Sequence, residues 1–333
     1  IMVTGKLEKR GESSFGLFMR RNFWLLIFGL VHAYLLWMGD ILVSYAVCGF
    51  IVYWFRNLKP KWLIVLGILF LSVATAVTLF ANFGLQYGPP ETVAELSARW
   101  TPPQVMVDAE VAAYTGSWAQ QMAARTAESL QMHTVALFAW AIWRAGGLML
   151  IGMALYKWGV LTGKRDTRFY KRLALIGLGF GLPVVITGAI LNMNSGFANE
   201  FANFGPGYLF NYWASILVSL GYIGLITYGV QANWLPGLQK HLAAVGRTAL
   251  SNYFLQTLLA TFIFYGFGLS LFGSVERWGQ ILIVFSIWAL QLAISPWWLQ
   301  HFRFGPLEWL WRSLTYMSWQ PMRVQKPQQV YSV

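Results

Sequence analysis

Long apolar stretches alternate with short polar segments along most of this chain. The hydrocarbon core of a bilayer is about 30 Å thick, so a helix needs roughly 20 apolar residues to cross it. Eight stretches approach or reach that length, and they cover residues 22–38, 41–56, 62–82, 134–156, 173–193, 211–230, 248–272 and 278–300. The pattern predicts an all-α, polytopic transmembrane bundle of eight spans, in which the first two short spans meet at a tight turn.

The segments between the spans predict the domain organisation. Residues 1–300 are expected to form a single transmembrane helical domain with one large outer loop at 83–133. From about residue 118 no helix breaker separates this loop from the fourth span, so a continuous helix is predicted there. Residues 301–333 are expected to form a cytoplasmic amphipathic helix and tail, with Pro306 at the first helical position.

Composition excludes an ordinary soluble protein. Of the 333 residues, 57% are hydrophobic and only 11% are charged, whereas soluble globular domains carry about 25% charged residues. The chain therefore lacks the polar side chains that would be needed to cover one or two soluble domains of this length.

The distribution of charge predicts the orientation of the spans. The net charge is +12. With the N-terminus placed in the cytoplasm, the inner segments hold 20 of the 24 Lys and Arg residues and four of the 12 acids. This is the positive-inside pattern, and it places both termini in the cytoplasm. The basic surplus then faces anionic lipid, so membrane lipid is the expected partner and a nucleic acid is not.

Ionisable side chains inside the spans are candidate functional groups, because charge at membrane depth is costly. His32 lies in the first span and Asp40 at the outer turn, and both are predicted catalytic residues. Eight residues of continuous helix would separate them by about 12 Å, so no direct hydrogen bond between them is expected. Asp40 is also expected to cap the second span, which an Asp does well.

Four further residues are predicted to bind a substrate. Arg144 lies about ten residues into the fourth span, where it needs an anion, carbonyl groups or water. Asn252 and Gln256 are four residues apart, on one face of the seventh span, and Arg247 marks its inner edge. His32, Arg144 and Gln256 are expected at similar depths in the membrane, which predicts a water-filled cavity shared by the three residues. Interhelical hydrogen bonding for the amides, and contact with lipid phosphate for Arg247, are the structural alternatives.

Recognised motifs add little to this picture. The single cysteine, Cys48, lies within a span and is expected to be a small buried residue. No zinc motif, phosphate loop, dinucleotide fingerprint or nucleophile elbow is present. The sequence therefore predicts no metal site and leaves the cofactor unknown.

Four stretches of the chain resemble one family. They are HAYLLWMGDILVSYAVCGF at 32–50, the outer segment with Tyr114, Gly116 and Arg125, GRTALSNYFLQT at 246–257, and FGPLEWLWR at 304–312. Together these stretches resemble the YeiB-like bacterial inner-membrane proteins, a family with a domain of unknown function. The resemblance implies a multi-pass protein of the bacterial inner membrane. Family members normally begin with two further spans, which are expected to be missing here.

The resemblance also implies a direction for the chemistry. The family is distantly similar to transmembrane acyltransferases, which take an acyl group from a cytoplasmic donor and use a membrane-embedded histidine. Acyl-coenzyme A is then a candidate donor, His32 a candidate base or acyl carrier, and Arg144 and Gln256 candidate ligands of the donor.

Three functions stay open at this point. The first is transfer of an acyl group to an envelope or small-molecule acceptor. The second is transport of a small anionic or lipid-like molecule, with Arg144 as the binding charge. The third is a membrane partner protein without chemistry. Separately, the sequence is compatible with a homo-oligomer. The sequence identifies neither the substrate nor the reaction.

Overall fold

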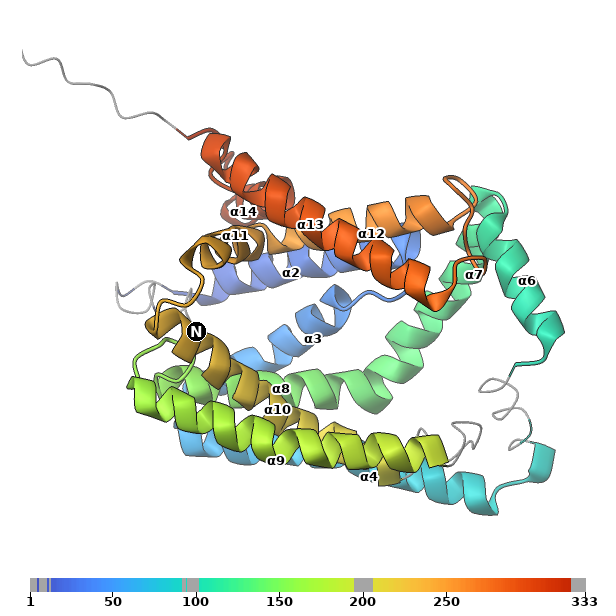
Figure 1. The fold of residues 1–333 in the computed structure, drawn as a ribbon, viewed down its shortest axis with the longest axis horizontal. Coiled ribbons are helices and arrows are strands. Elements are labelled where there is room, and N and C mark those ends of the chain that lie inside the picture. The colour runs from blue at the N-terminus through green and yellow to red at the C-terminus, as the bar shows by residue number, and fades with distance from the viewer. Residues whose placement is uncertain are drawn as a thin grey trace, which may run out of the picture. The chain divides into compact units, whose positions relative to one another are not determined.

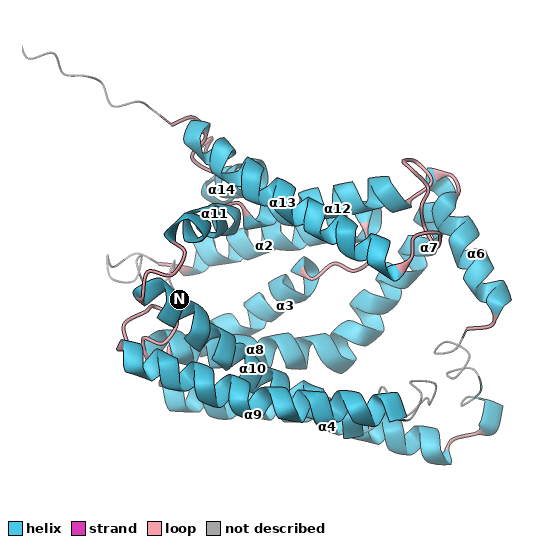
Figure 2. Ribbon diagram, in the orientation of Figure 1, coloured by secondary structure: helices cyan, strands magenta, loops and turns pink. Residues whose placement is uncertain are grey.

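The computed structural model describes residues 5, 11, 13–91, 94, 102–194 and 206–324, and this part of the chain is helical, without a β-strand (Figure 2). The helices follow one another in this order (Figure 1): α2 Phe15–Val31, η1 His32–Leu36, α3 Leu42–Val52, η2 Tyr53–Phe55, α4 Pro60–Tyr87, α6 Gln104–Thr115, α7 Trp118–Gln131, η3 Met132–Ala141, α8 Ile142–Lys157, α9 Thr167–Asn194, α10 Pro206–Gln231, α11 Pro236–Arg247, α12 Ala249–Phe264, α13 Arg277–His301 and α14 Pro306–Tyr316.

Five helical segments are long and apolar enough to cross a membrane. They are Pro60–Gly84, Trp118–Lys157, Thr167–Asn194, Gly207–Gln231 and Arg277–His301, and they match the third, fourth, fifth, sixth and eighth predicted spans. Two shorter apolar helices, Leu42–Phe55 and Ala249–Phe264, match the second and seventh. The all-α class and the membrane-like character of the chain are thereby confirmed.

Several boundaries differ from those predicted. The first helix begins earlier than residue 22, at Phe15, and its helical path ends at Leu36. The seventh span was predicted to reach residue 272, but α12 ends at Phe264. The chain turns after it, with left-handed backbone at Ser270 and Gly273, a conformation that does not continue a right-handed helix. Hydrophobicity alone did not reveal this turn, because the turning segment is itself apolar.

Two connecting segments contain helices that hydrophobicity did not predict. The predicted helix from residue 118 and the predicted start of the last helix are both confirmed. Helix α6 lies within the predicted loop at 83–133, and α11 connects α10 with α12. The predicted continuous helix from residue 118 is present, since α7, η3 and α8 follow one another without interruption. Helix α14 begins at Pro306, as predicted, and the tail from 325 to 333 lies outside the described residues.

The chain divides into two compact units. Unit 1 contains residues 1–46, 111–130 and 235–333, and unit 2 contains residues 47–110 and 131–234. In unit 2, α9 and α10 approach closely at Gly177, where an added Cβ would lie 2.5 Å from the backbone nitrogen of Gly221. Small residues at Gly177 and Gly221 therefore allow the two helices to pack closely.

Candidate functional site

His32 lies at the start of η1, a single π-helical turn that follows α2 in unit 1. The side chain is fully buried. The backbone N–H of Trp37 donates to the carbonyl of His32 over 2.9 Å, five residues back, which is the bond that defines a π turn. Trp37 itself has extended backbone angles, so the helix ends there. Single π turns of this kind recur at functional sites.

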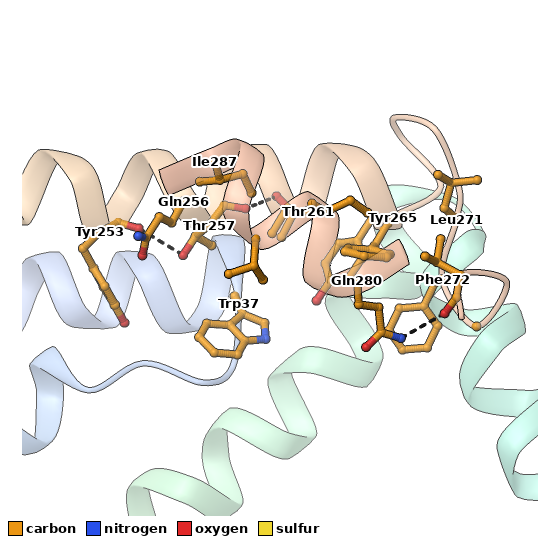
Figure 3. Close-up of a pocket in the computed structure, with 16 residues that line it drawn as sticks. Trp37, Tyr253, Gln256, Thr257, Thr261, Tyr265, Leu271, Phe272, Gln280 and Ile287 are labelled. Atoms are coloured by element: carbon orange, nitrogen blue, oxygen red, sulfur yellow. Dashed lines mark hydrogen bonds between the residues drawn. The ribbon is translucent and has the colours of Figure 1, made fainter. Parts of the chain in front are cut away.

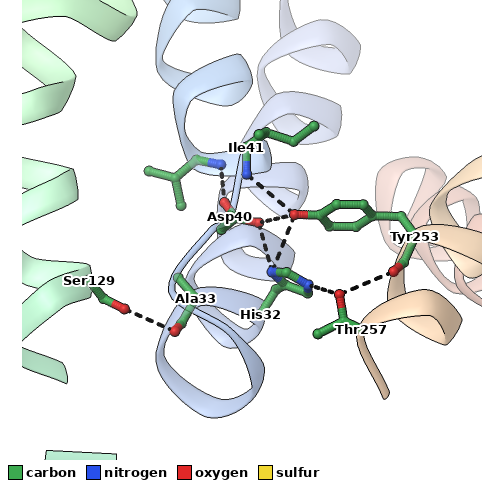
Figure 4. Close-up of polar contacts among 8 residues, drawn as sticks. His32, Ala33, Asp40, Ile41, Ser129, Tyr253 and Thr257 are labelled. Carbon is green, nitrogen blue, oxygen red and sulfur yellow. Dashed lines mark hydrogen bonds and ion pairs between the residues drawn. The ribbon is translucent and has the colours of Figure 1, made fainter. Parts of the chain in front are cut away.

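Asp40 contacts His32 directly, which corrects the sequence prediction that about 12 Å separates them. Asp40 Oδ1 lies 3.1 Å from His32 Nδ1. The prediction assumed a continuous helix up to the turn, whereas the chain leaves the helix after Leu36 and folds back (Figure 4). The second carboxylate oxygen of Asp40 accepts the N–H of Val43, 2.8 Å away, in the first turn of α3. This is the capping contact that the sequence predicted.

A glycine permits this fold-back. An added Cβ on Gly29 would lie 2.6 Å from the backbone nitrogen of Val43 and 3.0 Å from Asp40 Oδ2. Such distances are shorter than van der Waals contact, so a larger residue would displace the start of α3 and the Asp40 carboxylate. The pairing of His32 with Asp40 therefore depends on close approach between α2 and α3.

Two hydroxyl groups of α12 complete the arrangement around His32. Thr257 Oγ1 lies 2.9 Å from His32 Nε2, and Tyr253 Oη lies 3.3 Å from Asp40 Oδ1 and 3.4 Å from His32 Nδ1. Tyr253 and Thr257 are four residues apart, so they share one face of α12. We call His32, Asp40, Tyr253 and Thr257 the histidine cluster (Figure 4).

The chemistry of these groups assigns a direction to the hydrogen bonds. An ionised carboxylate can only accept, so Asp40 can hold the ring proton of His32 on Nδ1. In that tautomer Nε2 is an acceptor for the hydroxyl of Thr257, which also lies 3.3 Å from a second acceptor, the backbone carbonyl of Tyr253. A carboxylate that orients a histidine, and a histidine that accepts from a hydroxyl, is the arrangement that activates a hydroxyl nucleophile.

One face of α7 holds the π turn in place. Gln121, Arg125 and Ser129 recur every four residues and are all fully buried. Arg125 donates to the carbonyl of Leu36, 2.6 Å away, and Ser129 donates to the carbonyl of Ala33, 3.0 Å away. Leu36 is the last residue of η1, a position where the positive charge of Arg125 is favoured. Arg125 and Ser129 therefore fix the turn that carries His32.

Replacing Arg125 by Met should destabilise unit 1 and slow any reaction that uses His32. The substitution leaves the part-buried Leu36 carbonyl without its charged donor, which costs about 1–3 kcal/mol. Thermal unfolding in detergent would measure the loss. Arg277→Met is a matched control, because Arg277 is exposed at the start of α13 in the same unit. Equal stability of the two variants would contradict this role of Arg125.

A pocket of about 600 Å³ adjoins the histidine cluster (Figure 3). It lies between α12, the turn that follows it and α13, and its wall includes Trp37, Tyr253 and Thr257. Most of the other lining side chains are aliphatic or aromatic, with Gln256 and Gln280 among the polar exceptions. This volume is within the range of small-molecule sites, which are mainly apolar with a few placed polar groups.

The other predicted residues of α12 and α11 lie in unit 1. Gln256 donates to Gln291 of α13 over 2.8 Å and also lines the pocket. Asn252 donates to Ser295 of α13 over 3.0 Å. Arg247, at the end of α11, contacts the carbonyl of Arg303 at 3.4 Å. The amides thus make the interhelical bonds that were the structural alternative, while their predicted role in binding a substrate stays a prediction.

Arg144 lies in unit 2, on α8. Its guanidinium donates to the carbonyl of Tyr212 over 2.7 Å and to the hydroxyl of Ser215 over 2.8 Å. The same group lies over the ring of Tyr212, 4.2 Å from the centroid. Arg144 is thus held by a carbonyl, a hydroxyl and a ring. The cavity predicted to join it with His32 and Gln256 stays a prediction.

Sequence reasoning singled out His32 and Asp40 but assigned no role to Tyr253, Thr257 or Arg125. A signal for the two hydroxyls was present, since they recur at helical spacing within a stretch already noted for its polar residues. Arg125 was assigned to the outer loop, and nothing in its sequence surroundings reveals its burial. Within the described residues, no three His, Cys, Asp or Glu side chains gather to form a metal site.

Comparison with known proteins places the chain among bacterial proteins. A family model described as "Protein of unknown function (DUF418)" matches residues 155–318. YeiB of Escherichia coli (strain K12) is 31% identical over 305 residues, which cover 87% of this chain and 73% of YeiB. YxaH of Bacillus subtilis (strain 168) is 27% identical, over 97% of this chain and 77% of YxaH.

A 39.9 kDa protein of Bacillus acidopullulyticus is also similar, at 27% identity over 98% of this chain and 78% of its own length. No solved structure matches the chain. The identity with YeiB extends over most of both sequences. The chain therefore belongs to the YeiB-like family of bacterial proteins, a family of unknown function with membrane-like helices.

Proposed function

We propose that the protein transfers an acyl group from a thioester donor, such as acyl-coenzyme A, to a hydroxyl of an envelope or small-molecule acceptor. The observation that carries this proposal is the line of contacts from Asp40 through His32 to Thr257, a residue that also lines an apolar pocket. A base oriented by a carboxylate, a hydroxyl within 2.9 Å of that base and an apolar space beside them are the parts that acyl transfer requires.

In the first half of the reaction, Thr257 Oγ1 attacks the thioester carbonyl while its proton passes to His32 Nε2. A bond forms between Oγ1 and the acyl carbon, and the bond from that carbon to sulfur breaks. The thiolate leaves with the proton that His32 received. His32 acts as general base and then general acid, and Asp40 stabilises the charge on the ring meanwhile.

In the second half, the acceptor hydroxyl takes the position of the departed thiol. His32 removes its proton, the acceptor oxygen bonds to the acyl carbon, and the bond to Thr257 Oγ1 breaks. Thr257 recovers its proton from His32, so the protein returns to its starting state. The aliphatic and aromatic side chains of the pocket would hold the hydrocarbon part of the acyl group out of water.

We further propose that the chain crosses the bacterial inner membrane eight times with both termini in the cytoplasm. Five long apolar helices, the two shorter ones, and α2 together with η1 supply eight spans in the order that the sequence predicts. The concentration of Lys and Arg in alternate connections supports the orientation. Thr257 is eight residues from the start of α12 and seven from its end, so this topology places the cluster near mid-membrane.

Incubation of the purified protein with a labelled acyl thioester tests the proposed activity. We expect label to appear on Thr257 when no acceptor is present, and to leave it when a hydroxyl acceptor is added. Peptide mass analysis would locate the label. Absence of label on the protein and on every acceptor offered would contradict acyl transfer.

Transport of a small anion is the second candidate, and Arg144 is the observation that favours it. Its charge lies within a predicted span, and among the described residues it has no carboxylate partner. If liposomes take up an anion only when Arg144 is intact, and no label is transferred, transport is favoured over acyl transfer. If replacing His32 or Arg144 changes neither uptake nor label transfer, the third candidate, a partner protein without chemistry, is favoured.

A further inference from the structure

A group of arginines occurs where α2 packs against α14 in unit 1. Arg21 lies on α2, and its guanidinium lies over the ring of Trp311, 3.9 Å from the centroid. The indole N–H of Trp311 donates to the backbone carbonyl of Arg21 over 2.8 Å, which holds the two helices in register. Arg312 is the next residue on α14.

Aromatic rings also hold the guanidinium of Arg312, which lies 4.6 Å from the ring centroid of Phe304 and 5.7 Å from that of Tyr316. Stacking of this kind covers the face of a guanidinium and leaves the N–H groups at its edge available. The Nε of Arg312 is buried and has no hydrogen-bond partner among the described residues. Within that part of the chain, this donor is unsatisfied.

No acid compensates these charges within the part of the chain that the structure describes. Glu308 is the only acid of α14, and its carboxylate accepts from the backbone N–H groups of Leu250 and Ser251 at the start of α12. It also accepts from the hydroxyl of Ser251. The ion pair between His32 and Asp40 involves neither arginine. Arg21 and Arg312 therefore have no carboxylate partner among the described residues.

The two arginines also act on each other. Burial, and then the neighbouring charge of Arg312, lower the pKa of the Arg21 guanidinium from its ordinary value. Like charges held close together by packing are costly unless an anion lies between them. Arg20, at the adjacent position of α2, donates to the sulfur of Met317, a weak acceptor.

We propose that Arg21 and Arg312, held by Trp311 and Phe304, bind a phosphate group at the junction of α2 and α14. Guanidinium groups with stacked faces and free edges match the geometry of phosphate oxygens, which they bind through paired hydrogen bonds. Under the proposed topology this junction lies at the inner membrane surface. The phosphate then comes either from the headgroup of an anionic lipid or from a soluble phosphate compound.

Thermal unfolding of the full chain in detergent tests the site and its source. One arm adds phosphatidylglycerol to the micelles, and the other adds inorganic phosphate at constant ionic strength. A ligand that binds only the folded protein raises the unfolding temperature. We expect a rise with one of the two probes, and an Arg21→Gln/Arg312→Gln variant should require at least about tenfold more of that probe for the same rise.

A rise with phosphatidylglycerol alone assigns the site to a lipid headgroup, and a rise with inorganic phosphate assigns it to a soluble phosphate. Arg168→Gln/Arg172→Gln is the matched control, because it removes the same charge from exposed positions of unit 2. If both double variants lose the response equally, the response depends only on the total positive charge of the protein, and the proposal is overturned. No response of the unmodified protein to either probe would also overturn it.

The double variant could fail to fold, and Arg312→Lys keeps the test decisive in that case. Lysine retains the charge but lacks the planar group that stacks on Phe304 and binds two oxygens. We expect a weaker response of this variant to the effective probe. An unchanged response would show that the unsatisfied Nε of Arg312 does not contact the ligand.

Discussion

Replacing His32 by Gln is expected to slow acyl transfer by about 100- to 10,000-fold, the range that general acid–base catalysis supplies. The amide of Gln can form hydrogen bonds but cannot accept and return a proton near neutral pH. Thr257 would then keep its proton and stay a weak nucleophile. The measurement is the initial rate of label transfer from the thioester to the protein.

His241→Gln provides the control for this variant. His241 is exposed on α11, where its Nδ1 contacts the carbonyl of Gly237, and it has no part in the histidine cluster. Its replacement should leave the rate unchanged. The proposed role of His32 fails if both variants transfer label at the rate of the unmodified protein while remaining folded.

Replacing Thr257 by Val should abolish the labelled protein intermediate. Valine has nearly the shape of threonine, so the wall of the pocket is kept while the hydroxyl is lost. Thr257→Ser keeps the hydroxyl and should still acquire label, now on the serine. Both results are read from the mass of the peptide that contains residue 257 after incubation with donor in the absence of acceptor.

Thr261→Val is a matched control one helical turn further along α12. Thr261 also lines the pocket, and its hydroxyl donates to the backbone carbonyl of Thr257 rather than to His32. Label should accumulate normally in this variant. If Thr257→Val still transfers acyl groups to acceptors while His32→Gln does not, His32 acts directly on the acceptor hydroxyl and no ester forms on Thr257.

Much of the fold follows from the length of the apolar stretches in the sequence, because a span needs about 20 apolar residues to cross the lipid. The long helices α4, α9, α10 and α13 lie where that rule predicts them. The rule does not locate helix ends. It extended the seventh span into an apolar turn, and it gave no sign of α11, whose mixed composition resembles a polar connection.

The sequence predicted only those site residues whose side chains can carry a charge inside a membrane span. His32 and Asp40 stand out because ionisable residues are rare in a span. Their contact did not follow, since it depends on a π turn and a fold-back that eight residues of sequence do not encode in any recognisable way. Tyr253 and Thr257 are common, uncharged residues of membrane helices, so their role is visible only once α12 lies against η1.

The carboxylate of Glu308 has a consequence for the position of Thr257, the proposed nucleophile. The Glu308 carboxylate accepts from two backbone N–H groups in the first turn of α12. It therefore fixes where α12 lies along its own axis. Thr257 follows Leu250 by seven residues, or about two turns. A shift in these hydrogen bonds would thus rotate or translate Thr257 relative to His32, so α14 would control the alignment of the proposed nucleophile with its proposed base through a contact two helical turns away.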